Sequence, residues 1–332
     1  MKNNTIISLF SGAGGLDLGF KQAGFKTIWA NEFDKTIWDT FSYNFQNTFL
    51  DKRSIVNISE NDIPDGCIGI IGGPPCQSWS EAGAGRGITD KRGQLFYDYI
   101  RILKAKQPRF FLAENVPGML QPKHSEALNA ILTEFSEIGY NVKRYLLNAY
   151  DYSVPQDRKR VIIVGYHHDL GKIFIPPKPR SEKLTLKDAI WDLRLSKPAL
   201  DKNYTNGDSN LSASNHEYMT GGFSTIYMSR NRVRGWDEPS FTIQAGGRHA
   251  PIHPQAPKML FIEQNKRIFV PGKEHLYRRL TVRECARIQT FPDDFIFQYQ
   301  NVSDGYKMVG NAVPVEFARR LAEVIHNDIV LS

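Results

Sequence analysis

The sequence predicts a doubly wound α/β domain followed by a smaller, irregular, partly β domain. In the first half of the chain, apolar β-rich runs alternate with amphipathic helical patterns. Right-handed crossovers between such strands give a mostly parallel sheet with helices on both faces. The pattern changes near residue 180, where "PPKPR" precedes a segment, 196–275, that is rich in Asn, Ser, Gly, Pro and Arg. That composition favours irregular and β structure over a second α/β unit.

Strands and helices are expected to alternate along the first domain. Apolar runs predict strands over residues 5–10, 24–31, 67–71, 109–115 and 160–166. Helical spacing predicts helices between the first two strands and over 95–107 and 126–139. Further on, Thr281, Glu284 and Pro292 predict a helix that begins with a capping box and ends at the proline. The pattern "PVEFARRLAEVIHNDI" predicts one more amphipathic helix.

Composition limits the class of protein. The chain has 332 residues, more than one typical domain, and its 41% hydrophobic residues suit a packed core. It has no run of about 18 apolar residues and no signal-peptide pattern, so we expect a cytoplasmic protein with no membrane partner. Three cysteines without metal-ligand spacing predict neither disulfides nor a metal site. The net charge of +7 favours a polyanionic partner without establishing one.

The first predicted strand runs into "FSGAGGLDLGF", where glycines allow the backbone to approach a ligand at the start of a helix. The dinucleotide pattern G-x-G-x-x-G fails because Asp17 stands where the third glycine belongs, which disfavours a nicotinamide enzyme. Glu32 closes the second strand 20 residues after Gly12, where a carboxylate can bind both ribose hydroxyls. A nucleoside without a pyrophosphate, such as S-adenosylmethionine, fits both features. A tight turn beside an exposed acid is the alternative.

The stretch "GGPPCQ" places Cys76 after the carboxyl end of a predicted strand, the edge at which open α/β sheets bind ligands. Two prolines precede the thiol, and a glycine-rich segment with basic residues, "QSWSEAGAGRGITDKRG", follows it. A nucleophilic cysteine beside such a loop suits attack on an anionic polymer, provided that a proton acceptor produces the thiolate. A buried structural thiol is the alternative, and it is the role expected of Cys67 and Cys285.

Three charged residues are further candidates. Glu114 ends the strand "RFFLAEN" at the same edge as Cys76, where an acid screened from water can share a proton with a substrate ring nitrogen. Arg158 and Arg160 alternate at the start of another strand, so both side chains are expected to point the same way and to bind a phosphate or a carbonyl. A salt-bridged glutamate and two surface arginines are the alternatives.

These segments, in this order, resemble the DNA cytosine C5-methyltransferases over nearly the whole chain. The family's segments appear as "LFSGAGGLDLGF", "NEFD", "GGPPCQSWS", "AENV", "QDRKR", "RRLTVRECARIQTFPDDF" and "GYKMVGNAVPV". One departure is Asn57 before Ile58, where the family usually has Asp at the adenine amino group. An Asn can still accept a hydrogen bond through its carbonyl oxygen.

The resemblance implies a catalytic role for several candidates. Cys76 would add to C6 of cytosine, Glu114 would stabilise protonation at N3, and Arg160 would bind the O2 carbonyl. The methyl group would come from S-adenosylmethionine, with no metal. Because a base inside double-stranded DNA cannot be reached, the cytosine would be flipped out and held by closure of the loop after Cys76. Ser80 and Arg92 match loop positions that grip the target strand in the family.

The cofactor site follows from the same resemblance. Phe10 would stack near the adenine, and Glu32 would bind the ribose. The backbone of the glycine turn would approach the amino-acid moiety, at Gly12, Gly14 and Gly15. The remaining wall would be formed by Asn57, Ile58, Pro75, Leu95 and Asn311. Since Asn311 belongs to this wall, we expect a discontinuous catalytic domain of residues 1–180 with 310–332, and a target-recognition domain of residues 181–309.

The second domain carries the candidates for reading DNA. Arg230, Arg232 and Arg234 alternate, so an extended strand would present them on one face. Residues 246–247 are glycines that leave room for DNA just before Arg248. Arginine bidentate to guanine is the commonest specific base contact, so we expect at least two of Arg230, Arg232 and Arg248 to read bases. Contacts to phosphates alone are the alternative.

Within the family, the sequence is most similar to a member that acts on GGCC, which is therefore the expected target. Such an enzyme would be a monomer and would protect host DNA beside a restriction endonuclease of the same specificity. An RNA cytosine methyltransferase of the same fold is one alternative, although more than 90 residues separate "PPKPR" from "RRLTVRE". A non-catalytic DNA-binding relative is another, although Cys76 and Glu114 are both present.

Overall fold

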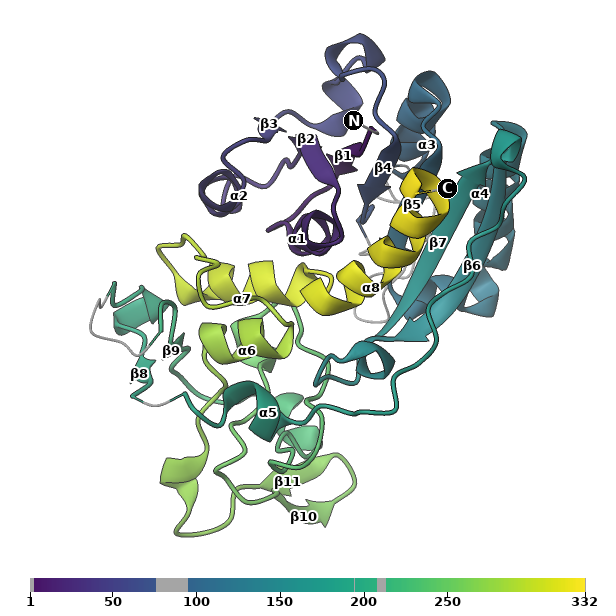
Figure 1. The fold of residues 1–332 in the computed structure, drawn as a ribbon. Coiled ribbons are helices and arrows are strands. Elements are labelled where there is room, and N and C mark those ends of the chain that lie inside the picture. The colour runs from purple at the N-terminus through teal and green to yellow at the C-terminus, as the bar shows by residue number, and fades with distance from the viewer. Residues whose placement is uncertain (1–2, 76–94, 194, 208–212, 332) are drawn as a thin grey trace. The chain divides into compact units, whose positions relative to one another are not determined.

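The structure is a computed structural model that covers most of the chain (Figure 1). The residues that it describes are 3–75, 95–193, 195–207 and 213–331. They form two compact units, which we call the sheet unit and the loop unit. The sheet unit consists of Met1–Asn148, Lys159–Pro179 and Phe317–Ser332, and the loop unit of Ala149–Arg158 and Arg180–Glu316. The catalytic and target-recognition roles expected of residues 1–180 with 310–332 and of residues 181–309 stay predictions.

Within its described residues, the sheet unit contains a seven-stranded sheet in the order β3-β2-β1-β4-β5-β7-β6 (Figure 1). The strands are β1 (Thr5–Leu9), β2 (Lys26–Asn31), β3 (Phe49–Asp51), β4 (Gly69–Gly72), β5 (Phe110–Asn115), β6 (Tyr140–Asn148) and β7 (Lys159–His167). Neighbours from β3 to β5 pair in parallel, whereas β7 runs antiparallel to both β5 and β6. The predicted doubly wound, mostly parallel sheet is confirmed.

Helices cover both faces of this sheet. They are α1 (Gly15–Gln22), α2 (Trp38–Asn44), α3 (Leu95–Lys106), α4 (Ser125–Glu137) and α8 (Val315–His326), the last belonging to this unit from its third residue on. Alternate strand residues such as Ile7 and Phe111 form one core cluster with the apolar faces of α3 and α4. On the other face, Phe20 of α1 stacks on Phe110 with ring centroids 6.3 Å apart. Successive strand residues therefore pack against different helices, which explains the uninterrupted apolar runs.

The loop unit has short elements separated by irregular chain. Its strands are β8 (Lys197–Pro198), β9 (Glu217–Tyr218), β10 (Leu260–Glu263) and β11 (Lys266–Ile268), and its helices are α5 (Leu186–Ile190), α6 (Val282–Ile288) and α7 (Val302–Asn311). The predicted capping box opens α6: the Thr281 hydroxyl accepts from the Glu284 N–H at 3.0 Å, and the Glu284 carboxylate accepts from the Thr281 N–H at 2.8 Å. A partly β, irregular architecture was expected here, and it is found.

Two strands of the sheet were not predicted, β3 and β6. β6 is the edge strand at one side of the sheet and is partly exposed, with charged residues such as Lys143 and Arg144 among its positions. Its sequence therefore lacks the apolar run that marks the inner strands. Just before it, Gly139 adopts a φ of 105°, the left-handed conformation in which helices commonly end. None of the described helices is both long and apolar enough to span a membrane.

Candidate active site

The carboxyl ends of three parallel strands meet at one edge of the sheet. Leu9 of β1 pairs with Gly72 of β4, which in turn pairs with Ala113 of β5. β1 and β5 are two strand spacings apart, about 10 Å. The chain passes from β1 to β2 on one side and later to β4 on the other, so the strand order reverses between β1 and β4. Open α/β sheets bind their ligands at such a reversal.

A tight turn joins β1 to α1 at this edge. Gly12 and Gly14 have φ values of 56° and 88°, which glycine adopts without strain. A Cβ atom on Gly14 would lie 2.2 Å from a ring carbon of Phe45, so no larger residue fits there. Phe10 also has a positive φ, 53°, which is rare for an aromatic residue and marks a backbone held in a strained conformation.

Glu32 ties the end of β2 to this turn. One carboxylate oxygen accepts the backbone N–H of Gly12 at 2.9 Å, and the other accepts that of Asp34 at 2.7 Å. Burial raises the pKa of Glu32, although both backbone hydrogen bonds act to lower it. A carboxylate oxygen has two lone pairs, so each oxygen can accept a further hydrogen bond from a ligand hydroxyl. The acid and the glycine turn, predicted separately, form one structure.

The other expected cofactor residues differ in exposure. Asn57 is exposed at the end of the short helix Ile55–Asn57, whereas Ile58 is only 1% exposed and belongs to the core cluster under α3. Pro75 and Leu95 are partly buried, and Asn311, the last residue of α7, is exposed in the loop unit. Their contacts with a cofactor stay predictions.

Phe33 was missed by the sequence analysis. It follows Glu32 directly, and its side chain is 68% exposed. A large apolar ring left in water beside a candidate ribose-binding acid suits stacking on a purine base. The available signal was an aromatic residue directly after the acid that closes the second strand.

Glu114 and Arg160 form an ion pair at the same edge. Glu114 is the fifth residue of β5, and Arg160 is the second residue of β7. The residue that follows Arg160, Val161, pairs with Asn115, the residue that follows Glu114. Arg160 Nε lies 2.7 Å from Glu114 Oε1, and the two side chains are only 10% and 11% exposed. A Cβ atom on Gly73 would lie 3.3 Å from Glu114 Oε2, so the glycine leaves the carboxylate uncrowded. The predicted acid and arginine therefore lie side by side as an ion pair, and their catalytic roles stay predictions.

Asn115 holds the chain that leads to the predicted nucleophile. Its side-chain amide donates to the Pro74 carbonyl at 3.1 Å, and its side-chain oxygen accepts from the Val116 N–H at 2.9 Å. From the sequence, only its neighbour Glu114 was predicted as a site residue. The predicted residues Cys76, Ser80 and Arg92 lie outside the described residues.

Arg158 differs from its expected role beside Arg160. Its guanidinium is buried in the loop unit and donates to the backbone carbonyls of Ile243, Gly310 and Ala312, each at 2.9 Å. Arg160 instead pairs with Glu114 in the sheet unit. Arg158 precedes β7 and belongs to the loop unit, whereas Arg160 lies within β7 and belongs to the sheet unit. The two guanidiniums therefore bind different partners. This bonding gives Arg158 a structural role that alternation along the sequence did not reveal.

The three alternating arginines do not share one environment. Residues 230–234 form no strand in the described structure beyond an isolated bridge at Val233. Arg232 lies over the Tyr227 ring at 4.7 Å and donates to the carbonyls of Ile226 and Tyr227. Arg234 pairs with the carboxylate of Glu238, and its guanidinium stacks on a neighbouring phenylalanine ring. Arg230 and Arg248 are exposed.

These features define a class of protein. A doubly wound sheet, a glycine turn after β1, an acid closing β2 and an acid–arginine pair at the next strand ends belong to the Rossmann-like methyltransferases. The family model described as C-5 cytosine-specific DNA methylase matches residues 4–327. The chain belongs to this family, and it is a DNA cytosine C5-methyltransferase.

Individual relatives cover almost the whole chain. It is 58% identical over 327 residues to the type II methyltransferase M.MthTI of Methanothermobacter thermautotrophicus, with 98% of each chain covered. It is 58% identical over 324 residues to the type II methyltransferase M.FnuDI of Fusobacterium nucleatum, with 96% of this chain and 93% of the relative covered. A crystal structure of a prophage-encoded candidate DNA modification methyltransferase from E. coli has a TM-score of 0.74 at 25% identity, covering 98% and 99% of the two chains.

Proposed function

We propose that the enzyme transfers a methyl group from S-adenosylmethionine to C5 of a flipped-out cytosine in double-stranded DNA, within GGCC. The observation that carries this proposal is the buried Glu114–Arg160 pair beside the segment that leads to Cys76. An acid and a guanidinium side by side match the N3 and O2 edge of cytosine, which accepts a hydrogen bond at both atoms.

The cofactor residues fit a nucleoside with a charged amino-acid tail. The Glu32 oxygens suit the two ribose hydroxyls, and the exposed Phe33 ring suits the adenine. The turn at Gly12 brings backbone close to the ligand without side chains in the way. When bound, S-adenosylmethionine supplies an electrophilic methyl group. The residues of the chain orient it at the reversal point between β1 and β4.

The cytosine must become a nucleophile at C5 before it can be methylated. In the proposed mechanism the Cys76 thiolate adds to C6, forming an S–C6 bond, while Glu114 supplies the proton that N3 takes up. Arg160 fixes the Glu114 carboxyl through Nε and directs its remaining N–H donors to O2. C5 would then bond to the methyl group as the bond between the methyl carbon and the sulfonium sulfur breaks, which leaves S-adenosylhomocysteine. Loss of the C5 proton to solvent, return of the N3 proton to Glu114 and cleavage of the S–C6 bond restore the enzyme and release 5-methylcytosine.

The GGCC target rests on resemblance alone. The catalytic loop and "STIYMSRNRVRGW" resemble the HaeIII modification methyltransferase, which acts on GGCC. We therefore propose that the protein is the modification half of a type II restriction–modification system, paired with an endonuclease that cuts the same site. A monomeric state and a cytoplasmic location stay predictions.

A transfer assay with labelled S-adenosylmethionine tests the substrate. It compares a duplex with one GGCC site, the same duplex rearranged to GCGC, and tRNA. We expect label only in the first substrate, at C5 of cytosine. Label in tRNA would favour the RNA methyltransferase, and no label in any substrate would favour the non-catalytic relative. Equal labelling of the two duplexes would contradict the proposed target.

A trapping assay tests the nucleophile. On a duplex that carries 5-fluorocytosine, the C5 substituent cannot leave as a proton, so the enzyme should stay covalently bound. Cys76→Ser should abolish both trapping and transfer while it leaves DNA binding intact. Cys67→Ser, which changes a buried thiol of the sheet unit, is the matched control and should trap normally. Trapping by the Cys76 variant would contradict the mechanism.

A further inference from the structure

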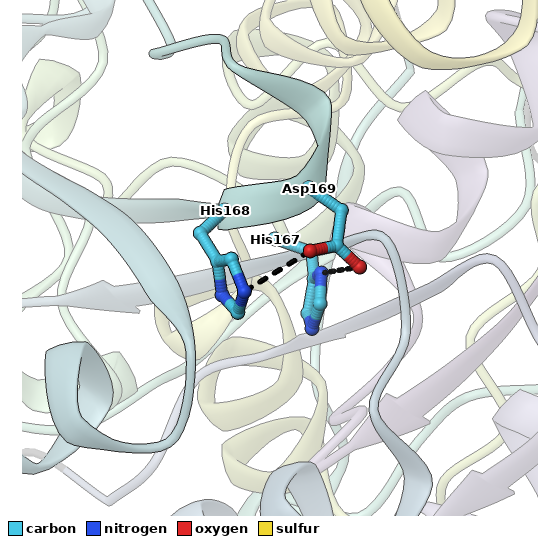
Figure 2. A group of neighbouring side chains, drawn as sticks. All are labelled: His167, His168 and Asp169. Carbon is cyan, nitrogen blue, oxygen red and sulfur yellow. Dashed lines mark ion pairs between the residues drawn. The ribbon is translucent and has the colours of Figure 1, made fainter.

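Three consecutive side chains gather at the end of β7, at the edge of the sheet opposite to Glu114 and Arg160. Figure 2 shows the carboxylate of Asp169 directed toward the rings of His167 and His168. Asp169 Oδ2 lies 3.2 Å from His167 Nδ1, and Asp169 Oδ1 lies 3.0 Å from His168 Nε2. One donor atom from each residue lies within 4.8 Å of the others. Two imidazoles and a carboxylate so arranged form a set of ligands for a divalent cation.

This cluster is remote from the active site. β7 runs antiparallel to β5, so its last residue lies at the sheet edge opposite to Glu114 and Arg160. His167 is seven residue steps beyond Arg160, which corresponds to about 23 Å along an extended strand. A cation bound at the end of β7 cannot touch the reacting base. Its role would be structural.

The orientation of His168 is fixed from outside the cluster. His168 Nδ1 lies 2.8 Å from the Gly139 carbonyl oxygen, which can only accept, so Nδ1 carries the hydrogen. The other ring nitrogen, Nε2, is the one directed at Asp169. Metal-ligating histidines typically have this arrangement, in which one ring nitrogen donates to a carbonyl and the other binds the ion.

The backbone of the cluster is also held by the sheet. The N–H of His167 donates to the Arg109 carbonyl at 2.8 Å, and that of His168 donates to the Gly139 carbonyl at 2.9 Å. The two imidazoles stack with ring centroids 4.6 Å apart, and the Tyr140 ring contacts His167 edge-on. Asp169 is 73% exposed, so water can complete the coordination.

The geometry points to a binding site for a late first-row divalent ion, of the Zn²⁺ or Ni²⁺ kind, formed by His167, His168 and Asp169. Two nitrogens and one oxygen favour these ions over Mg²⁺, which prefers oxygen ligands alone. A bound ion would join the end of β7 to the turn that follows it, and through His168 to Gly139 between α4 and β6. The absence of a metal was expected from the cysteine spacing and from the family resemblance, and neither concerns this cluster, which contains no cysteine.

Zinc binding by the full-length protein tests the site. Competition with a chromophoric chelator gives the Zn²⁺ affinity of the wild type, of His168→Ala and of Asp169→Asn. We expect one ion per chain and a loss of affinity of about tenfold or more in each variant. His275→Ala removes an exposed histidine of the loop unit and should bind zinc as the wild type does. Mg²⁺ at the same concentration should not compete.

Cu²⁺ provides a second readout that identifies the ligands. Electron paramagnetic resonance should show superhyperfine coupling to two imidazole nitrogens in the wild type and to one in His168→Ala. Methyl transfer should be unchanged in both cluster variants, which shows that they fold and that the site is separate from catalysis. Equal Zn²⁺ affinity in the wild type and the variants, or no binding by the wild type, would overturn the proposal and leave the cluster as an ion pair only.

Discussion

Two buried acids, Asp17 of the sheet unit and Glu284 of the loop unit, have hydrogen-bond donors of different kinds. In the sheet unit, Asp17 accepts hydrogen bonds from the hydroxyls of Ser8 and Thr27 at 3.0 and 3.1 Å. In the loop unit, Glu284 accepts two hydrogen bonds from the Arg278 guanidinium, at 2.7 and 2.8 Å. Burial raises the pKa of Asp17 to about 6. Burial acts on Glu284 in the same direction, but Arg278 outweighs it and lowers the pKa to about 2. Neutral donors leave the cost of a buried charge in place, whereas a guanidinium offsets it.

The same contrast extends to the backbone. In the sheet unit, ladder hydrogen bonds satisfy the strand carbonyls. In the loop unit, where strands are short, buried arginines donate to carbonyls instead. Arg158 binds three, Arg283 binds three, and Arg279 binds those of Gly221 and Gly222 while it stacks on Phe223. A buried carbonyl without a hydrogen-bond donor is costly. These arginine side chains therefore donate the hydrogen bonds that a neighbouring strand would otherwise donate. The loop unit therefore depends on single residues more than the sheet unit does.

Arg283→Met is the strongest test of this dependence. The side chain is fully buried and donates to the carbonyls of Ser214, Pro292 and Phe295 at 2.8, 3.0 and 2.8 Å. Methionine fills much of the volume but leaves these carbonyls unsatisfied, so we expect a loss of about 3–5 kcal/mol in the free energy of unfolding. Hydrogen exchange should show faster exchange in the loop unit, with β5 protected as before.

Arg287→Met is the matched control for this substitution. Arg287 lies one helical turn further along α6, and its partners are the exposed carboxylates of Asp192 and Asp293. Arg287 is 18% exposed, but both partner carboxylates lie largely in water. Ion pairs with solvated carboxylates contribute little, so we expect a loss of about 1 kcal/mol. Equal losses in the two variants would show that buried arginines have no special weight in this unit.

The two acids predict opposite effects of pH on stability. The native-state pKa of Asp17 lies above its ordinary value of 3.8, so its contribution to stability is complete below about pH 4 and is lost as the pH rises through 6. The pKa of Glu284 lies below its ordinary value of 4.5, so its contribution is complete above that pH and is lost as the pH falls toward 2.

Urea unfolding between pH 3 and pH 7 measures both contributions. Asp17→Asn should remove a decrease of up to about 3 kcal/mol between pH 4 and pH 6, since the amide keeps partners for both hydroxyls but has no charge to bury. Glu284→Gln should instead lower stability at pH 7 and flatten the acid side of the profile. If stability depends on pH in Asp17→Asn as it does in the wild type, the decrease between pH 4 and pH 6 does not come from Asp17.

Sequence alone predicted the sheet unit better than the loop unit, and the contrast above explains why. The strand Phe110–Asn115 is buried along its whole length, so its apolar run was visible in the sequence. The partly exposed β6 left no such signal. Glu114 and Arg160 were predicted as residues because they end or begin strands, but their pairing depends on β7 lying next to β5.

In the loop unit the decisive contacts are long-range. Arg158 binds carbonyls that are 85, 152 and 154 residues away in the sequence, and no local spacing indicates such partners. The alternation of Arg230, Arg232 and Arg234 suggested one face of a strand. Aromatic rings and an acid nearby in space bind the last two instead.

Glu32→Ala tests whether the acid that follows β2 of the sheet unit binds the cofactor. Removal of the carboxylate takes away the proposed ribose contacts and the bonds to the N–H groups of Gly12 and Asp34. We expect S-adenosylmethionine to bind more weakly by about 1–3 kcal/mol in calorimetry. Asp39→Ala, which removes an exposed acid from α2, is the control and should bind normally. Unchanged affinity in Glu32→Ala would place the ribose elsewhere.

The last prediction separates arginines that hold the loop unit together from arginines that read DNA. Arg232 and Arg234 have partners within the unit, whereas Arg230 and Arg248 are exposed. Arg230→Ala and Arg248→Ala should change the free energy of unfolding by no more than about 0.5 kcal/mol. Each should weaken binding to the preferred site by about 1–3 kcal/mol and relax discrimination at one base pair, as measured by methylation of a mixed DNA library.

Arg232→Ala should lose about 1 kcal/mol of stability as well, since it gives up its ring contact and two carbonyl bonds. If Arg230→Ala and Arg248→Ala weaken all sequences alike and reduce the salt dependence, these arginines bind phosphates, and the sequence must be read by other residues.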